Sequence, residues 1–124
     1  MRNFWKITGW YLFAVGIIHN VVGAFIMSEI LLDILTTGLK GHIHTNTEYV
    51  AIYWMLFVGF FFIYIGLHWQ EQIRRYKEPL SKFTAWGLTV ITVVELIIEP
   101  ISGFWLLVPL CFSMLYPHYF IKTK

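Results

Sequence analysis

The sequence predicts an all-α protein: a four-helix transmembrane bundle with short loops and one longer outer loop between its first two helices. Hydrophobic residues make up 58% of the 124 residues and charged residues only 13%, whereas a soluble domain has roughly 25% charged residues. The hydrophobic residues also gather in four runs that charged segments separate. This composition excludes a soluble enzyme, a nucleic-acid-binding module, a disulfide scaffold and a disordered tail.

Each run is close to the ~20 residues that a helix needs to cross a hydrocarbon core of about 30 Å. A helix satisfies its own backbone hydrogen bonds, which lipid cannot do. We therefore predict spans over Ile7–Met27, Tyr49–His68, Phe83–Ile98 and Ile101–Phe120, in a single domain of residues 1–124. The first run is longer than a signal-peptide core and no small-residue cleavage site follows it, so we expect it to be retained.

The segments between the runs differ in length. Residues 28–48 begin with SEILLDILTTGL, whose apolar residues lie three and four positions apart, as in a short helix on the outer membrane surface. Residues 70–82 are expected to continue the second helix until Pro79 stops it. The third segment, residues 99–103, has room only for a tight hairpin.

The distribution of Lys and Arg predicts the orientation, because these residues favour the cytoplasmic side of short loops. Of the nine basic residues, one lies in the first loop and eight lie in segments that four spans bring to the same side. These eight are Arg2, Lys6, Arg74, Arg75, Lys77, Lys82, Lys122 and Lys124. We therefore expect both termini to be cytoplasmic.

Glycines recur every seven residues in the first two runs. They are Gly9, Gly16 and Gly23, and then Gly59 and Gly66. Seven residues are close to two helical turns, so each set forms a stripe, and small residues let helices approach closely in membranes. His19 and Asn20 follow Gly16 by three and four positions, and are therefore expected to face the bundle.

Polar residues in the outer half of the predicted bundle are the candidate site. Ionisable side chains are costly inside a bilayer, yet His19 lies near mid-depth, and Glu95 and Glu99 share one face at the outer end of the third run. We predict that His19, Asn20, Glu95 and Glu99 form a polar pocket that binds a small molecule or a lipid. The bilayer itself is the other expected partner, and no nucleic acid is expected.

Three other interpretations stay open. In a purely structural one, His19 bonds a neighbouring carbonyl and Glu95 reaches the headgroups. In a membrane-embedded enzyme, His19 and Glu95 would act as an acid/base pair on a lipophilic substrate, which requires both to reach one cavity. A transporter or channel would need a homo-oligomer, because so small a chain cannot enclose a path alone.

A metal site is a weaker alternative, and we predict none. Zinc accepts imidazole and carboxylate ligands, which His19, Glu95 and Glu99 would offer, or His42 and His44 of the first loop. However, the spacing H-x-H is not specific, and nothing in the chain resembles H-E-x-x-H.

The sequence identifies no cofactor. His68 and His118 lie near the cytoplasmic ends of their runs, far in depth from His19, so we do not expect a haem held by two histidines. There is no phosphate-binding glycine loop or dinucleotide fingerprint. The sole cysteine, Cys111, lies inside an apolar run and is expected to be a small core residue.

Three segments carry a family resemblance: GWYLFAVGIIHNVVG, YWMLFVGFFFIYIGLH and PISGFWLLVP. With G-x-x-H at Gly16–His19 and P-x-S-G-F-W at Pro100–Trp105 as its most specific elements, the chain resembles an uncharacterised bacterial family of small four-span integral membrane proteins. The resemblance covers about residues 9–117. It implies the four-helix fold and the bacterial cytoplasmic membrane, but no activity and no site residues. Read physically, Ser102 is positioned to cap the fourth helix.

Overall fold

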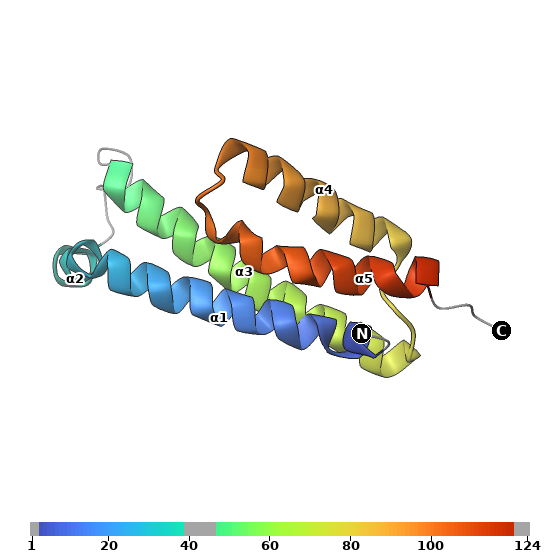
Figure 1. Ribbon diagram of the computed structural model, residues 1–124. Helices are drawn as coiled ribbons and strands as arrows, with labels where there is room; N and C mark the ends of the chain where they lie inside the picture. Colours follow the sequence, from blue (N-terminus) through green and yellow to red (C-terminus); the bar gives the residue numbers. More distant parts are fainter. Residues whose placement is uncertain (1–2, 39–46, 121–124) are drawn as a thin grey trace.

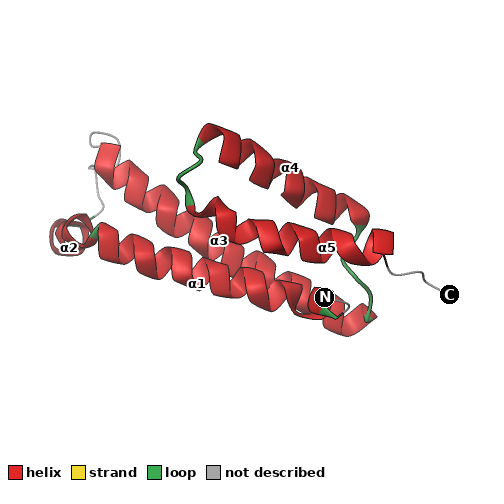
Figure 2. Ribbon diagram, viewed as in Figure 1, coloured by secondary structure: helices red, strands yellow, loops and turns green. Residues whose placement is uncertain are grey.

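The computed structural model describes residues 3–38 and 47–120, and all regular structure in these ranges is helical. The elements are the 3-10 helix η1 (Phe4–Ile7), α1 (Thr8–Ile26), α2 (Ser28–Thr37), α3 (Thr47–Tyr76), α4 (Lys82–Ile98), the 3-10 helix η2 (Gly103–Leu107) and α5 (Val108–Phe120) (Figure 1). Short connections join most of them (Figure 2). The predicted all-α class is confirmed for this part of the chain.

The helix boundaries follow the hydrophobic pattern closely for α1 and α4. The predicted extension of the second helix is also present, since α3 continues to Tyr76. It ends there because Lys77 adopts a φ of 54°, and its N–H donates to the carbonyl of Ile73 at 2.9 Å. A residue in the left-handed conformation after the last turn is a common way to end a helix. Pro79 then prevents α3 from continuing, because it has no N–H to donate.

The structure differs from the four-span prediction in the length of its helices. Two of them, Phe4–Ile26 and Thr47–Tyr76, are long and apolar enough to cross a membrane. At 1.5 Å per residue, α4 measures roughly 25 Å and α5 roughly 20 Å. The fourth predicted run is divided because η2 precedes α5, and Pro109, which lacks an N–H, lies in the first turn of α5, where proline is tolerated.

The glycine stripes bring α1 and α3 together as an antiparallel pair. A Cβ on Gly9 would lie 2.4 Å from the backbone N of Gln70, and one on Gly16 would lie 2.7 Å from the carbonyl O of Gly59. From α3, a Cβ on Gly66 would lie 2.5 Å from the N of Phe13. Only glycine permits backbones this close, so the packing predicted for the stripes is confirmed.

A second pair is formed by α4 and α5. The helix contacts of α4 are with α5 and η2, and α5 in turn contacts α1. The buried core therefore runs from Leu12 of α1 through Leu107 and Leu110 to Ala85 of α4. Cys111 is buried as expected, and its Sγ lies 3.5 Å from Oγ1 of the buried Thr92. The two pairs meet along α1 and α5, and Figure 1 shows α4 on the far side of α5.

The side chain of Gln70 in α3 hydrogen-bonds the backbone at the start of α1. The residue preceding α1 makes no side-chain cap, although the N–H of Thr8 bonds the carbonyl of Trp5 in η1. Gln70 Oε1 accepts from the N–H of Trp10 at 3.2 Å, and Gln70 Nε2 donates to the carbonyl of Lys6 at 3.0 Å. A side chain 60 residues away in the sequence thus serves as the cap.

α2 runs across the direction of the other helices, because Figure 1 shows it end-on at the end of α1. It buries Ile34, and the hydroxyl of Tyr49 donates to Asp33. A helix was predicted here, and the structure contains it.

Candidate functional site

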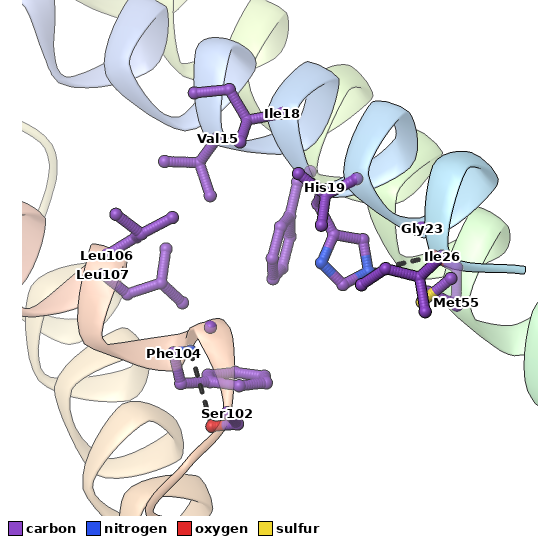
Figure 3. Close-up of a pocket in the computed structure, with 13 residues that line it drawn as sticks. Val15, Ile18, His19, Gly23, Ile26, Met55, Ser102, Phe104, Leu106 and Leu107 are labelled. Atoms are coloured by element: carbon purple, nitrogen blue, oxygen red, sulfur yellow. Dashed lines mark hydrogen bonds between the residues drawn. The ribbon is translucent and has the colours of Figure 1, made fainter.

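A cavity of about 300 Å³ lies between the two helix pairs, on the side where α1 faces η2 (Figure 3). One wall consists of α1 residues from Val15 to Ile26. Met55 and Phe62 of α3 complete that side, and residues 102–104 with 106 and 107 form the opposite wall. The lining along α1 spans roughly 16 Å at 1.5 Å per residue.

The lining is almost entirely apolar. His19 and Ser102 are its only polar side chains among the residues that the structure describes. Several lining side chains, Ile18, Val22, Ile26 and Leu106, are also exposed on the molecular surface. The cavity therefore opens sideways through an apolar rim. Its volume falls at the lower end of the range for small-molecule sites.

His19 is held in place by α3. Its Nε2 lies 3.1 Å from the carbonyl O of Met55, and its ring centroid is 6.2 Å from that of Phe62. A carbonyl only accepts hydrogen bonds, so Nε2 must carry the hydrogen. The seven-residue stripe places His19 here, because Gly16 and Gly23 on either side of it allow α1 to lie against α3.

The opposite wall is fixed by hydrogen bonds around η2. Ser102 Oγ accepts from the N–H of Phe104 at 3.4 Å, which confirms the predicted cap. Trp105 Nε1 donates to the carbonyl of Pro100 at 2.7 Å. Tyr11 Oη of α1 donates to the carbonyl of Leu106 at 2.8 Å and so ties this wall to the first helix pair.

The four predicted site residues do not line one cavity. His19 lines the cavity. The neighbouring Asn20 packs against Gly59 instead, and a Cβ built on Gly59 would lie 1.8 Å from Asn20 Oδ1. Glu95 is half-buried on α4, and Glu99 is exposed just after that helix. The physical reason is that α4 packs on α5 and η2, so its acidic end does not reach α1. The pocket is therefore more apolar than predicted.

This separation bears on the alternative in which His19 and Glu95 act as an acid/base pair. That chemistry needs both groups within reach of one substrate, and Glu95 is not part of the lining. His19 instead bonds a neighbouring carbonyl, as the structural interpretation expects.

The metal alternatives depend on residues in different parts of the chain. His42 and His44 lie outside the described residues. Within residues 3–38 and 47–120, no group of three or more His, Cys, Asp or Glu side chains is placed to hold a metal ion. His68 pairs with Gln72, and His118 with the carbonyl of Leu80 at 2.7 Å.

Sequence reasoning missed Met55, Phe62 and Phe104 as cavity residues. Met55 and Phe62 lie four residues before and three residues after Gly59, so they share its helix face. Extending the glycine stripe along α3 would therefore have found both. Phe104 reaches the cavity only because η2 is placed opposite α1, which no local pattern specifies.

Residues 3–119 match the model of a family described as a family of unknown function (DUF6463). The match covers nearly the whole chain, which agrees with the resemblance to an uncharacterised family drawn from the motifs. No curated protein and no solved structure matches the chain.

Proposed function

We propose that the chain, which belongs to this family of unknown function, is a small polytopic bacterial membrane protein. It holds a lipid or a small lipophilic molecule in the cavity beside His19. The observation that carries the proposal is the cavity itself: an apolar space between two helix pairs, open at an apolar rim, with one imidazole at its wall.

The exposed apolar surface supports the membrane part of the proposal. Only 28% of the apolar stretch of the first long helix and 17% of that of the second is buried. A soluble protein rarely leaves so much apolar surface in water, whereas lipid is the solvent that such surfaces require. Figure 1 also places the long helices side by side, as spans would lie.

The two shorter helices fit a bilayer as well. The 17 residues of α4 stand at the lower limit for a span of about 17–25 residues. At ~2 Å per residue for η2 and 1.5 Å for α5, the two together reach roughly 30 Å. We therefore extend the proposal to four crossings, with η2 and α5 as the fourth.

Charge distribution supports an orientation in the cytoplasmic membrane with both termini inside. All five basic residues of the described part lie in η1, at the end of α3 or at the start of α4: Lys6, Arg74, Arg75, Lys77 and Lys82. Figure 1 places these three regions and the end of α5 at the same end of the molecule. Basic residues favour the cytoplasmic side.

A binding function is favoured over catalysis because the cavity offers shape and one polar contact without a second reactive group. The lining contains no Asp, Glu, Lys, Arg or Cys side chain in the part that the structure describes. Binding sites for small molecules are mostly apolar with few polar groups, which describes this cavity.

A pair of adjacent substitutions tests the proposal. Val22 and Val21 are both exposed on α1, but only Val22 lines the cavity. Val22→Trp is expected to fill part of the space, and Val21→Trp serves as the matched control with the same added bulk. Each variant, reconstituted in lipid nanodiscs, is titrated with 1-aminoanthracene, a small aromatic amine that fluoresces. Lipids retained through purification are identified by native mass spectrometry.

The expected result is that Val22→Trp loses at least tenfold in affinity for the fluorophore and retains less co-purifying lipid, while Val21→Trp behaves as the unmodified protein. Equal binding by all three proteins, or no binding above that of empty nanodiscs, would refute the binding function.

A further inference from the structure

We infer that the cavity selects lipophilic molecules bearing a hydroxyl group, such as a long-chain alcohol or a phenol, whose O–H donates to Nδ1 of His19. The inference rests on the proposed binding function and assigns its ligand class.

The first step concerns the hydrogen on the imidazole. Because the carbonyl of Met55 accepts from Nε2 at 3.1 Å, the hydrogen of a neutral ring resides on Nε2. The other nitrogen, Nδ1, then has a lone pair and is a hydrogen-bond acceptor. Nδ1 is therefore always the acceptor towards a ligand, because the bond to Met55 keeps the hydrogen on Nε2.

The second step concerns the surroundings of Nδ1. Figure 3 shows this nitrogen on the side of the ring opposite the bond to Met55, at the edge of the open space between α1 and η2. No hydrogen-bond partner for Nδ1 is found among residues 3–38 and 47–120. In an apolar cavity an unpaired acceptor costs free energy, and a bound donor removes this cost.

The third step excludes head groups that only accept hydrogen bonds and head groups that carry a negative charge. A ketone, an ester or an ether brings only acceptors, so its oxygen cannot pair with the Nδ1 lone pair. The lining has no cationic side chain within the described residues to pair with a carboxylate or a phosphate. A hydroxyl supplies the missing donor without bringing a charge into the apolar space.

The fourth step places the rest of the ligand. From His19 the lining continues through Val22 to Ile26, both exposed at the rim. An alkyl chain lying along this side leaves the hydroxyl at the imidazole and its far end at the apolar surface. The site would thus take a hydroxylated lipid from the bilayer side.

Two isomers test the inference: 1-dodecanol and 1-methoxyundecane have the same formula and number of heavy atoms, but only the alcohol can donate a hydrogen bond. Each displaces 1-aminoanthracene from the protein in nanodiscs, with all measurements at one fixed pH. Dissociation constants are expressed as mole fractions in the lipid, so that the different partitioning of the isomers cancels.

We expect the alcohol to bind about threefold to tenfold more tightly than the ether. His19→Leu and His19→Phe should both reduce the ratio to about one while the ether still binds. Val21→Leu, at an exposed position of α1 outside the lining, should leave the preference unchanged.

The outcomes separate the two claims. If the isomers bind equally to the unmodified protein, or if His19→Leu keeps the preference, the hydroxyl inference is wrong while the binding function stands. If the fluorophore binds but neither isomer displaces it, the hydroxyl inference is again wrong. In this displacement assay, the binding function itself fails only if the fluorophore binds no better than to empty nanodiscs.

A measurement on the unmodified protein gives an independent check should the His19 variants fail to fold. With 15N-labelled histidine, one Nδ1 resonance should move on addition of 1-dodecanol and stay in place with 1-methoxyundecane. Absence of any imidazole response to the alcohol would overturn the inference.

Discussion

Two adjacent residues of α1 show how one step along a helix changes the environment of a polar side chain. His19 and Asn20 differ by about 100° around the helix axis. His19 reaches the edge of the cavity and bonds Met55, whereas Asn20 is pressed against Gly59. Both amide atoms of Asn20 are buried without a hydrogen-bond partner among the described residues. Asn20 therefore contributes packing at the cost of an unpaired amide.

Replacing this amide by a hydrocarbon of the same shape is expected to stabilise the protein. Asn20→Leu removes two unpaired polar atoms, whose burial costs about 1–3 kcal/mol, and keeps the branched side chain against Gly59. The free energy of unfolding in detergent should therefore rise, and Val21→Leu at an exposed position serves as the control. A clear loss of stability in Asn20→Leu alone would mean that the amide has a partner.

At the scale of the element, the glycines have two different roles. Gly9, Gly16 and Gly66 lie where the backbones of α1 and α3 meet, and a Cβ on Gly16 would come within 2.7 Å of Gly59 O and 2.8 Å of Ile63 N. Gly87 of α4, by contrast, would place a Cβ in open space, with nothing within 4 Å. The same substitution therefore tests close packing at one position and helix propensity at the other.

Alanine substitutions at Gly16 and Gly87 should consequently change the stability of the protein in opposite directions. Gly16→Ala gains a little helix propensity but forces two backbones apart, and overpacking costs about 1–3 kcal/mol, so we expect net destabilisation. Gly87→Ala should stabilise the protein by about 0.5–1 kcal/mol, the usual penalty for glycine inside a helix. Thermal unfolding of both variants in the same detergent checks this, and stabilisation by Gly16→Ala would contradict the α1–α3 contact.

At the scale of the whole molecule, the two ends of the helix pairs differ in charge. The basic residues of the described part gather where α1 begins, while Glu29 and Asp33 of α2, Glu48 at the start of α3 and the acidic end of α4 lie at the other end. The cavity opens nearer to this acidic end, since its lining extends to Ile26 at the end of α1. In the proposed orientation, the ligand enters from the outer half of the bilayer.

Labelling of single cysteines tests that orientation. In intact bacterial cells, a membrane-impermeant maleimide should react with Glu29→Cys and not with Lys6→Cys or Lys82→Cys, because the charge rule places the last two inside. The native Cys111 is buried, and the unmodified protein provides the background. Permeabilised cells should label all three variants. Labelling of Lys6→Cys and Lys82→Cys from opposite sides would refute the proposed topology.

The sequence by itself determined which segments are helical, the approximate ends of α1, α3 and α4, and the small-residue faces that allow close packing. These properties are local: the hydrophobic runs specify which segments are helical, and glycines at seven-residue spacing mark the face on which α1 and α3 meet. The cap at Ser102 and the helix after Met27 were predictable for the same reason.

Only the tertiary structure decided which polar residues share a cavity. Glu95 and His19 were expected together because both lie in the outer half, but depth along a span says nothing about the direction of a side chain relative to other helices. The packing of α4 against α5 and η2 separates Glu95 from the cavity, and the same packing brings Phe104 to it. Contacts between distant segments depend on how side chains interlock, which no local spacing encodes.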